Sequence, residues 1–162
     1  MSQEEPTSEE EILRLNGILN VKYADSISER NPEEQFSKLE IAIACYERAH
    51  QIRTDQSDRS ALFMIAVIYY DMAFRYNNEN NAEGSSSSIA NCLEKCMLIF
   101  DDDATDIIYK GQAKLLAAKA YRFIGKYDDA KRLLRDAKEI IKPENEQYIH
   151  VLRLEDELKD VS

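Results

Sequence analysis

The chain has 162 residues, and 44% of them are hydrophobic, enough to form the core of one domain. With only four glycines and three prolines it lacks the turn residues that an all-β protein needs, so the composition favours an all-α fold. The net charge of -10 argues against nucleic-acid binding. The sequence has no apolar run long enough for a membrane span, and three cysteines do not form a disulfide framework. Because the first residues are acidic and do not resemble a targeting signal, we expect a cytoplasmic or nuclear protein.

Residues 1–7 are acidic and show no periodicity, so we predict a disordered tail there. A first helix is predicted over 9–26, because Ser8 and Glu11 have the spacing of a capping box. Gly17 weakens this helix unless a neighbour packs close to it. Residues at helical spacing predict its apolar stripe: Ile12, Leu15, Ile18 or Leu19, and Lys22 or Tyr23.

The second helix is predicted over 38–53. Asn31 and Pro32 interrupt the preceding segment, because a residue before proline disfavours the helical conformation. Ser37 and Glu40 then form a second capping-box motif, which indicates a new helix start. We therefore expect a long connection between the first two helices.

The third helix, predicted over 59–76, is the most apolar in the chain. A helix that is apolar on most faces is either buried on most faces or presents a binding surface. The segment 77–88, NNENNAEGSSSS, has low complexity, and we expect a mobile loop there. A fourth helix is predicted over 89–100.

Two amphipathic helices joined by a tight turn are predicted over 104–124 and 128–142. Gly125 stands where the chain must reverse, a position that favours a residue tolerating positive φ. Pro143 cannot continue the second of these helices. A seventh helix over 144–159 has one polar side, and we expect its apolar side to cover the last exposed face of the preceding helices.

The segment 115–143 resembles one tetratricopeptide repeat, a pair of antiparallel helices. Lys114 departs from the repeat pattern, because it stands where that repeat usually has a tryptophan. The resemblance is carried by small, aromatic and apolar residues at the spacing of the repeat: Ala118, Tyr121, Gly125, Tyr127, Ala130, Leu134, Ala137 and Pro143. Weaker copies of the pattern occur earlier in the chain.

The resemblance implies an all-α, right-handed superhelix of three antiparallel helix pairs with a C-terminal capping helix. It implies a single domain over 8–160, with repeats at about 9–53, 59–100 and 104–142 and the capping helix at 144–159. Fold alone does not identify a partner, since this architecture serves many functions.

No motif in the sequence supports catalysis, and we predict a protein without enzymatic activity, cofactor or metal. Cys92 and Cys96 lie one helical turn apart, but no further metal ligand is evident and thiols are common core residues. The run 101–103 of three aspartates lacks the glycine and the distal glutamate of a calcium loop. We expect that run to form a helix junction.

Charge is distributed unevenly along the chain. The segment 110–142 holds ten basic and four acidic residues, a net charge of +6 in a chain of net charge -10, so the remainder carries -16. In the resembled family the first helix of each pair lines a concave groove. The resemblance therefore implies a peptide-binding groove, apolar at one end and basic at the other, formed by Phe63, Val67, Tyr70, Leu115, Lys119, Arg122 and Lys126.

Such a groove suits an acidic or phosphorylated segment of a partner protein that carries apolar anchors. The alternative interpretation is that the basic residues form a solvated face or pair with the protein's own Glu-rich tail. Co-chaperones of the family clamp a chaperone's terminal carboxylate with Lys, Asn and Arg. Here Phe63 and Val67 replace clamp residues and Lys119 and Arg122 are out of register, so we predict no carboxylate clamp and no chaperone binding.

Two functions remain open. The first is a non-enzymatic adaptor that binds a peptide or helical segment of a partner in its concave groove, with no nucleic-acid or membrane ligand. The second is a structural subunit of a multiprotein complex that packs through its convex face or its capping helix. A self-associating scaffold, such as a homodimer, is a variant of the second function, because the apolar third helix could be buried in another copy.

Overall fold

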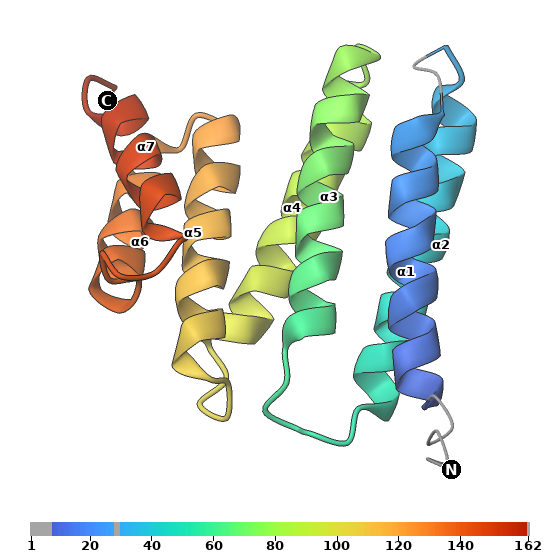
Figure 1. Cartoon of the computed structure of the whole chain (residues 1–162). Coiled ribbons are helices and arrows are strands. Elements are labelled where there is room, and N and C mark those ends of the chain that lie inside the picture. The colour runs from blue at the N-terminus through green and yellow to red at the C-terminus, as the bar shows by residue number, and fades with distance from the viewer. Residues whose placement is uncertain (1–7, 28–29, 162) are drawn as a thin grey trace. The chain divides into compact units, whose positions relative to one another are not determined.

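The computed structural model describes residues 8–27 and 30–161, which form helices and short connections without any strand (Figure 1). The all-α prediction is confirmed, while the predicted tail at 1–7 lies outside the described residues. None of the helices described is long and apolar enough to cross a membrane. The described residues form seven helices: α1 (Glu9–Ser26), α2 (Pro32–Ile52), α3 (Ser60–Asn78), α4 (Ala82–Phe100), α5 (Ile107–Phe123), α6 (Tyr127–Ile140) and α7 (Tyr148–Leu158).

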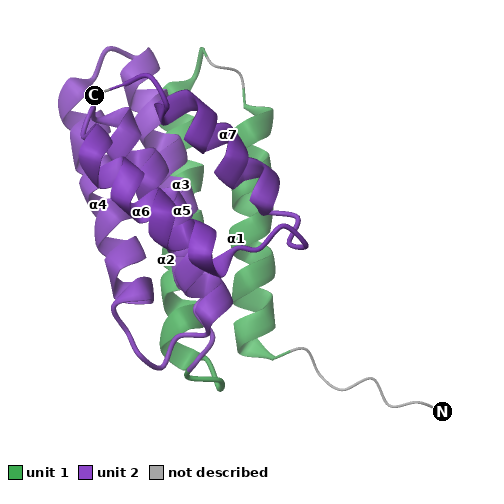
Figure 2. Ribbon diagram, turned by 90° about the vertical axis from the view of Figure 1, so that its left-hand side faces the viewer, with its two compact units in different colours: residues 1–56 green, residues 57–162 purple. Residues whose placement is uncertain are grey.

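The chain divides into two compact units, Met1–Gln56 and Ser57–Ser162 (Figure 2). In the first unit, α1 and α2 pack side by side. In the second unit, α3 packs on α4 and α5 packs on α6. The two pairs are joined because α5 also packs on α4 and α3, and α7 then packs on α6 and α5.

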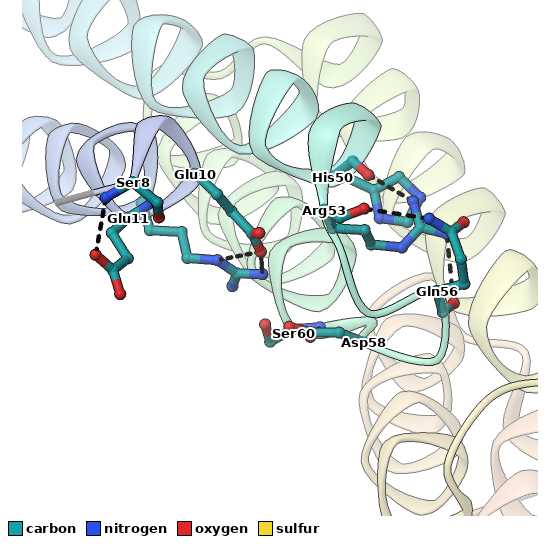
Figure 3. Close-up of polar contacts among 9 residues, drawn as sticks. Ser8, Glu10, Glu11, His50, Arg53, Gln56, Asp58 and Ser60 are labelled. Atoms are coloured by element: carbon teal, nitrogen blue, oxygen red, sulfur yellow. Dashed lines mark hydrogen bonds and ion pairs between the residues drawn. The ribbon is translucent and has the colours of Figure 1, made fainter. Parts of the chain in front are cut away.

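Helix α1 begins where the capping box predicts. The backbone N–H of Ser8 donates to the carboxylate of Glu11 at 3.1 Å, and the N–H of Glu11 donates to the Ser8 hydroxyl at 3.2 Å (Figure 3). The two bonds satisfy backbone donors that the first helical turn leaves free.

The predicted apolar stripe of α1 is wrong as its packing face. Its large apolar residues stay 40–60% exposed: Ile12, Leu15, Ile18, Leu19 and Tyr23. The helix instead packs on α2 through Gly17 and Ala24, both buried. A Cβ on Gly17 would lie 2.6 Å from a ring carbon of Tyr46, so the glycine allows an approach that no larger residue could. Close packing through small residues has overridden the hydrophobic periodicity.

Helix α2 begins earlier than predicted. Pro32 occupies its first turn, where a missing N–H removes no helical hydrogen bond, so the proline starts the helix and does not separate it from the preceding turn. Ser37 and Glu40 lie inside the helix, and the predicted second capping box and long connection are wrong. At the other end, the Arg53 guanidinium donates to the carbonyl of His50 (Figure 3).

The predicted mobile loop at 77–88 is wrong, because most of it is helical. The side chain of Asn81 accepts a hydrogen bond from the N–H of Gly84 at 2.8 Å and so caps α4. Ser85 is buried, and its hydroxyl donates to the carbonyl of Ala73 on α3 at 3.0 Å. The small polar residues of this segment, which are typical of a linker in sequence, form the contact between the closely packed helices α3 and α4.

The α5–α6 turn forms as predicted, with Gly125 at φ 77°. The start of α5 differs, because Asp106 caps it by accepting from the N–H of Ile108 at 3.0 Å. Asp102, in the predicted helix junction, forms an ion pair with the buried side chain of Arg59 at the start of α3. This pair ties the α4–α5 connection to α3.

Candidate functional site

Three of the predicted site residues meet in one pocket of the second unit. Tyr70 on α3 and Lys119 and Arg122 on α5 line a cavity of about 180 Å³. Helix α7 forms the remaining wall with four residues: His150, Arg153, Leu154 and Glu157. The pocket therefore lies where α3, α5 and α7 come together.

Helical spacing explains how these side chains converge. Lys119 and Arg122 are three residues apart on α5, which puts them on one face of the helix. The other side of α5 is buried through small residues such as Ala117 and Ala120, so that neighbouring helices approach closely. On α7, the lining residues recur at intervals of three and four and share one face in the same way.

The other four predicted site residues do not line this pocket. Leu115 is only 4% exposed and belongs to the core. Phe63 and Val67 are half-buried on α3, and Lys126 is exposed in the turn after α5. Of the seven residues predicted for the groove, this pocket thus brings together Tyr70, Lys119 and Arg122.

Lys119 is the distinctive group of the pocket. Its side chain is half-buried, and within residues 8–27 and 30–161 it has neither an ion pair nor a hydrogen bond through its ammonium group. Burial lowers its pKa below the usual value, and the positive charges of Arg122 and Arg153 lower it further. A cation held near two others without a counter-charge is unfavourable in the free protein.

Arg122 and Tyr70 are oriented by their neighbours. The Arg122 guanidinium donates to the carboxylate of Glu157 and so connects α5 to α7. Burial raises the pKa of the Tyr70 hydroxyl, and the nearby charge of Arg122 partly offsets that rise. Tyr70 therefore stays protonated at neutral pH and keeps a hydrogen-bond donor in the pocket.

An aromatic cluster adjoins the pocket. The rings of Tyr70 and Phe74 meet edge to face with centroids 5.1 Å apart, and those of Phe74 and Phe123 meet at 4.7 Å. Tyr70 belongs to both the cluster and the pocket. Because Phe74 is 39% exposed, the cluster offers an apolar contact beside a basic site.

Three of the eight other basic residues in the segment 110–142 form ion pairs within the second unit. Lysines and arginines of α5 and α6 form ion pairs with acids of α6 and α7: Lys114 with Asp136 at 3.9 Å, Arg132 with Asp129 at 3.0 Å, and Lys138 with Glu155 at 2.8 Å. These acids are not those of the N-terminal tail. These ion pairs compensate part of the positive charge of the segment 110–142. The pocket formed by Lys119, Arg122 and Arg153 keeps an excess of positive charge.

A second, larger cavity of about 610 Å³ lies between α6 and α7. Its apolar lining comes from Leu134, Leu152 and Leu158. Three basic residues, Lys131, Arg135 and Lys159, and two acidic residues, Glu155 and Asp156, also line it. The net charge of its lining is +1, lower than the +2 of the pocket that contains Lys119, Arg122, Arg153 and Glu157.

Cys92 and Cys96 are both buried in α4. A hydrogen bond with Cys92 and burial raise the pKa of the Cys96 thiol well above its usual value. The described residues contain no group of three or more His, Cys, Asp or Glu placed to hold a metal ion. Protonated, buried thiols pack as small apolar side chains.

The sequence predicts α7 only as a capping helix and does not predict its contribution to the pocket. Arg153 lies outside the segment 110–142, so it does not contribute to the net charge of +6 of that segment. His150, Leu154 and Glu157 recur at spacings of four and three, which could have indicated a face directed at a neighbour. Phe74 follows Tyr70 by one helical turn, a spacing that predicts a ring contact.

No protein-family model matches the chain, and no curated protein or solved structure is detectably similar to it. The chemistry of the pocket is therefore the guide to function. Two guanidinium groups, an ammonium group and a phenol hydroxyl are donors that bind anions through charge-assisted hydrogen bonds.

Proposed function

We propose that this chain is a non-enzymatic adaptor of tetratricopeptide-like architecture that binds an acidic or phosphorylated segment of a partner protein. The observation that carries the proposal is the half-buried Lys119, which lacks a counter-charge among the described residues and lies beside Arg122 and Arg153. An anionic side chain of the partner would supply the missing negative charge. The aromatic cluster next to the pocket would accept an apolar anchor of the same segment.

The packing order of the second unit supports the tetratricopeptide-like part of the proposal. Helices α3 and α4 form one pair and α5 and α6 the next, and α5 packs on both members of the first pair. Helix α7 packs on α5 and α6 in the same manner. In stacked helical repeats each repeat contacts its neighbours in this way, and the first helices share one face. The pocket is lined by α3, α5 and α7, which would be the first helices of successive repeats.

A capture experiment tests the proposed site. The wild-type chain and the double variant Lys119→Glu/Arg153→Glu are used to capture proteins from a native extract of the source cells, and the captured proteins are identified by mass spectrometry. Arg122 is left intact because its pairing with Glu157 connects α5 to α7. We expect the variant to lose partners that share an acidic or phosphorylated segment, since two attractive charges become repulsive.

The matched control is Lys126→Glu/Lys142→Glu, which makes the same change of charge at two exposed residues outside the pocket. This variant should keep the partners of the wild type. Equal loss in both variants would mean that overall charge, and not the pocket, decides binding. An unchanged set of partners in both would contradict the proposed function.

The second candidate function is a structural subunit that packs through α7. The groove between α6 and α7 favours it, because Leu152 lines that groove and is 41% exposed. Leu152→Asp should then abolish assembly while charge reversal in the basic pocket has no effect. Self-association is a variant of this candidate, favoured by the exposed apolar residues of α1, and sedimentation of the purified chain at increasing concentration tests it.

A further inference from the structure

We propose that the group bound in the basic pocket is a phosphate monoester dianion on a serine or threonine side chain of the partner segment. The inference rests on the proposed function and narrows its ligand from any acidic segment to a phosphorylated one. The pocket would then distinguish a modified partner from an unmodified one.

Charge balance is the first reason. Among the described residues that line the pocket, Lys119, Arg122 and Arg153 face a single acid, Glu157, which gives a net charge of +2 with histidine counted as neutral. One carboxylate from an Asp or Glu would leave one positive charge uncompensated. A phosphoserine or phosphothreonine carries roughly -1.5 to -2 at pH 7, which matches the excess.

The donor set is the second reason. A phosphate group presents three strong acceptor oxygens, one more than a carboxylate. The pocket offers the planar guanidinium groups of Arg122 and Arg153, the ammonium group of Lys119 and the hydroxyl of Tyr70. Guanidinium groups bind phosphate through paired hydrogen bonds, and an ammonium group binds it as a point charge.

The size of the cavity is the third reason. Sites for drug-sized ligands and cofactors span roughly 300–1,000 Å³. At about 180 Å³, this pocket is too small for a nucleotide but can take a phosphate group and the end of the side chain that carries it. The rest of the ligand must therefore lie outside the pocket, as the backbone of a peptide would.

The surroundings favour a peptide over a lipid surface or a nucleic acid. Both of these are extended polyanions and bind best to a broad basic face. Here the chain has a net charge of -10, and other basic residues of α5 and α6, such as Lys114 and Lys138, are paired with acids. The Tyr70, Phe74 and Phe123 cluster beside the pocket suits an apolar residue close to the phosphorylated one.

Three degenerate peptide libraries, identical except for a fixed central phosphoserine, glutamate or serine, test the inference with the full chain by fluorescence polarisation. We expect the phosphoserine library to bind at least about tenfold more tightly than the glutamate library, because it places a second charge and a third acceptor among the same donors. Lys119→Gln/Arg153→Gln should remove this preference, and Lys126→Gln/Lys142→Gln should keep it. Thermal unfolding checks that all variants are folded.

Equal binding of the glutamate and phosphoserine libraries would overturn the inference and leave the proposed adaptor function in place. If none of the three libraries binds but the capture experiment finds partners that depend on the pocket, the phosphate inference is likewise overturned and the adaptor function stays in place. Failure of both experiments would overturn the proposed function as well. Vesicles of phosphatidylserine and a single-stranded oligonucleotide are tested as alternative anionic ligands. If either binds as tightly as the phosphoserine library, and this binding depends on the pocket residues, the choice of a phosphopeptide is overturned.

Discussion

Arg122 of α5 donates a hydrogen bond to the carboxylate of Glu157 on α7, and this pair joins two of the three helices that line the basic pocket. Among the described residues that line the pocket, this carboxylate is the only acidic group. Glu157 therefore has two opposing effects. It holds α7 against α5, and it occupies a donor that an anionic ligand would otherwise use.

Glu157→Gln separates these effects. We expect a small loss of stability, about 0.2–1 kcal/mol in the free energy of unfolding, because the ion pair is partly exposed. We also expect tighter binding of an acidic or phosphorylated peptide, since the competing negative charge is gone. Calorimetric unfolding and peptide titration measure the two quantities on the same sample. Glu155→Gln is the control, because Glu155 pairs with Lys138 outside the basic pocket. A Glu157 variant that binds more weakly than the wild type would contradict this prediction.

Lys119→Met should raise the stability of the free protein. The lowered pKa of Lys119 means that the folded state binds this proton less firmly than the unfolded state. Its unfavourable contribution is present in full at neutral pH and fades as pH rises from the folded-state pKa towards the ordinary value of 10.5. The gain should be modest, about 0.5 kcal/mol at pH 7, because solvent screens a half-buried charge. The gain in stability should disappear in alkaline solution. The same substitution should abolish ligand binding.

Denaturant unfolding of the Lys119 variant and of Lys126→Met provides the comparison. Lys126 is exposed and lies outside the pocket, so its replacement should change neither stability nor binding. A lower stability of Lys119→Met at pH 7 would show that Lys119 is stabilising and that its charge is compensated in the native protein.

Gly17→Ala should destabilise the α1–α2 pair. The added methyl group would meet the Tyr46 ring at 2.6 Å, and overpacking of this kind costs about 1–3 kcal/mol. The better helix propensity of alanine offsets part of this, about 1 kcal/mol. Hydrogen exchange should show faster exchange of amides in α1 and α2. Asn16→Ala, on an exposed position of the same helix, should be neutral or stabilising, and slower exchange in the Gly17 variant would refute the close contact.

Asp102→Asn should lower the melting temperature at neutral pH. A hydrogen bond from the backbone N–H of Ala104 and another from Arg59 lower the pKa of the Asp102 carboxyl below its ordinary value of 3.8. A carboxyl with a lowered folded-state pKa stabilises the protein above its unfolded-state pKa and loses that contribution as pH falls through the folded-state value. The difference between variant and wild type should therefore shrink as pH falls below 3.8. Asp103→Asn is the control, and a difference for Asp102→Asn that persists in strong acid would contradict the assignment.

Local signals in the sequence predicted the features that depend on a few neighbouring residues. The capping box of Ser8 and Glu11 located the start of α1, and Gly125 located the α5–α6 turn. Helical spacing brought Lys119 and Arg122 to one face of α5, and the structure puts both in one pocket with Tyr70. Each of these depends on backbone chemistry within one or two helical turns.

The features that the sequence did not predict correctly depend instead on packing between helices. The serines after Gly84 resemble a linker, yet Ser85 is buried and bonded to the carbonyl of Ala73 across the α3–α4 seam. Gly17 packs on Tyr46 although larger apolar residues of α1 stay exposed. Arg153 joins the basic pocket only because α7 folds back on α5. Such contacts join residues distant in sequence, which periodicity and composition do not specify.

Site-specific photocrosslinking tests the central claim, that the face of α3, α5 and α7 binds a partner segment, most directly. p-Benzoylphenylalanine replaces Phe74 beside the basic pocket in one variant and Leu152 in the α6–α7 groove in another. Each variant is irradiated in native extract, and the crosslinked peptides are sequenced by mass spectrometry. We predict crosslinks from position 74 to an acidic or phosphorylated segment of a partner, lost when Lys119 and Arg153 are replaced by glutamate. Crosslinks from position 152 alone would contradict this claim and indicate a subunit held through α7.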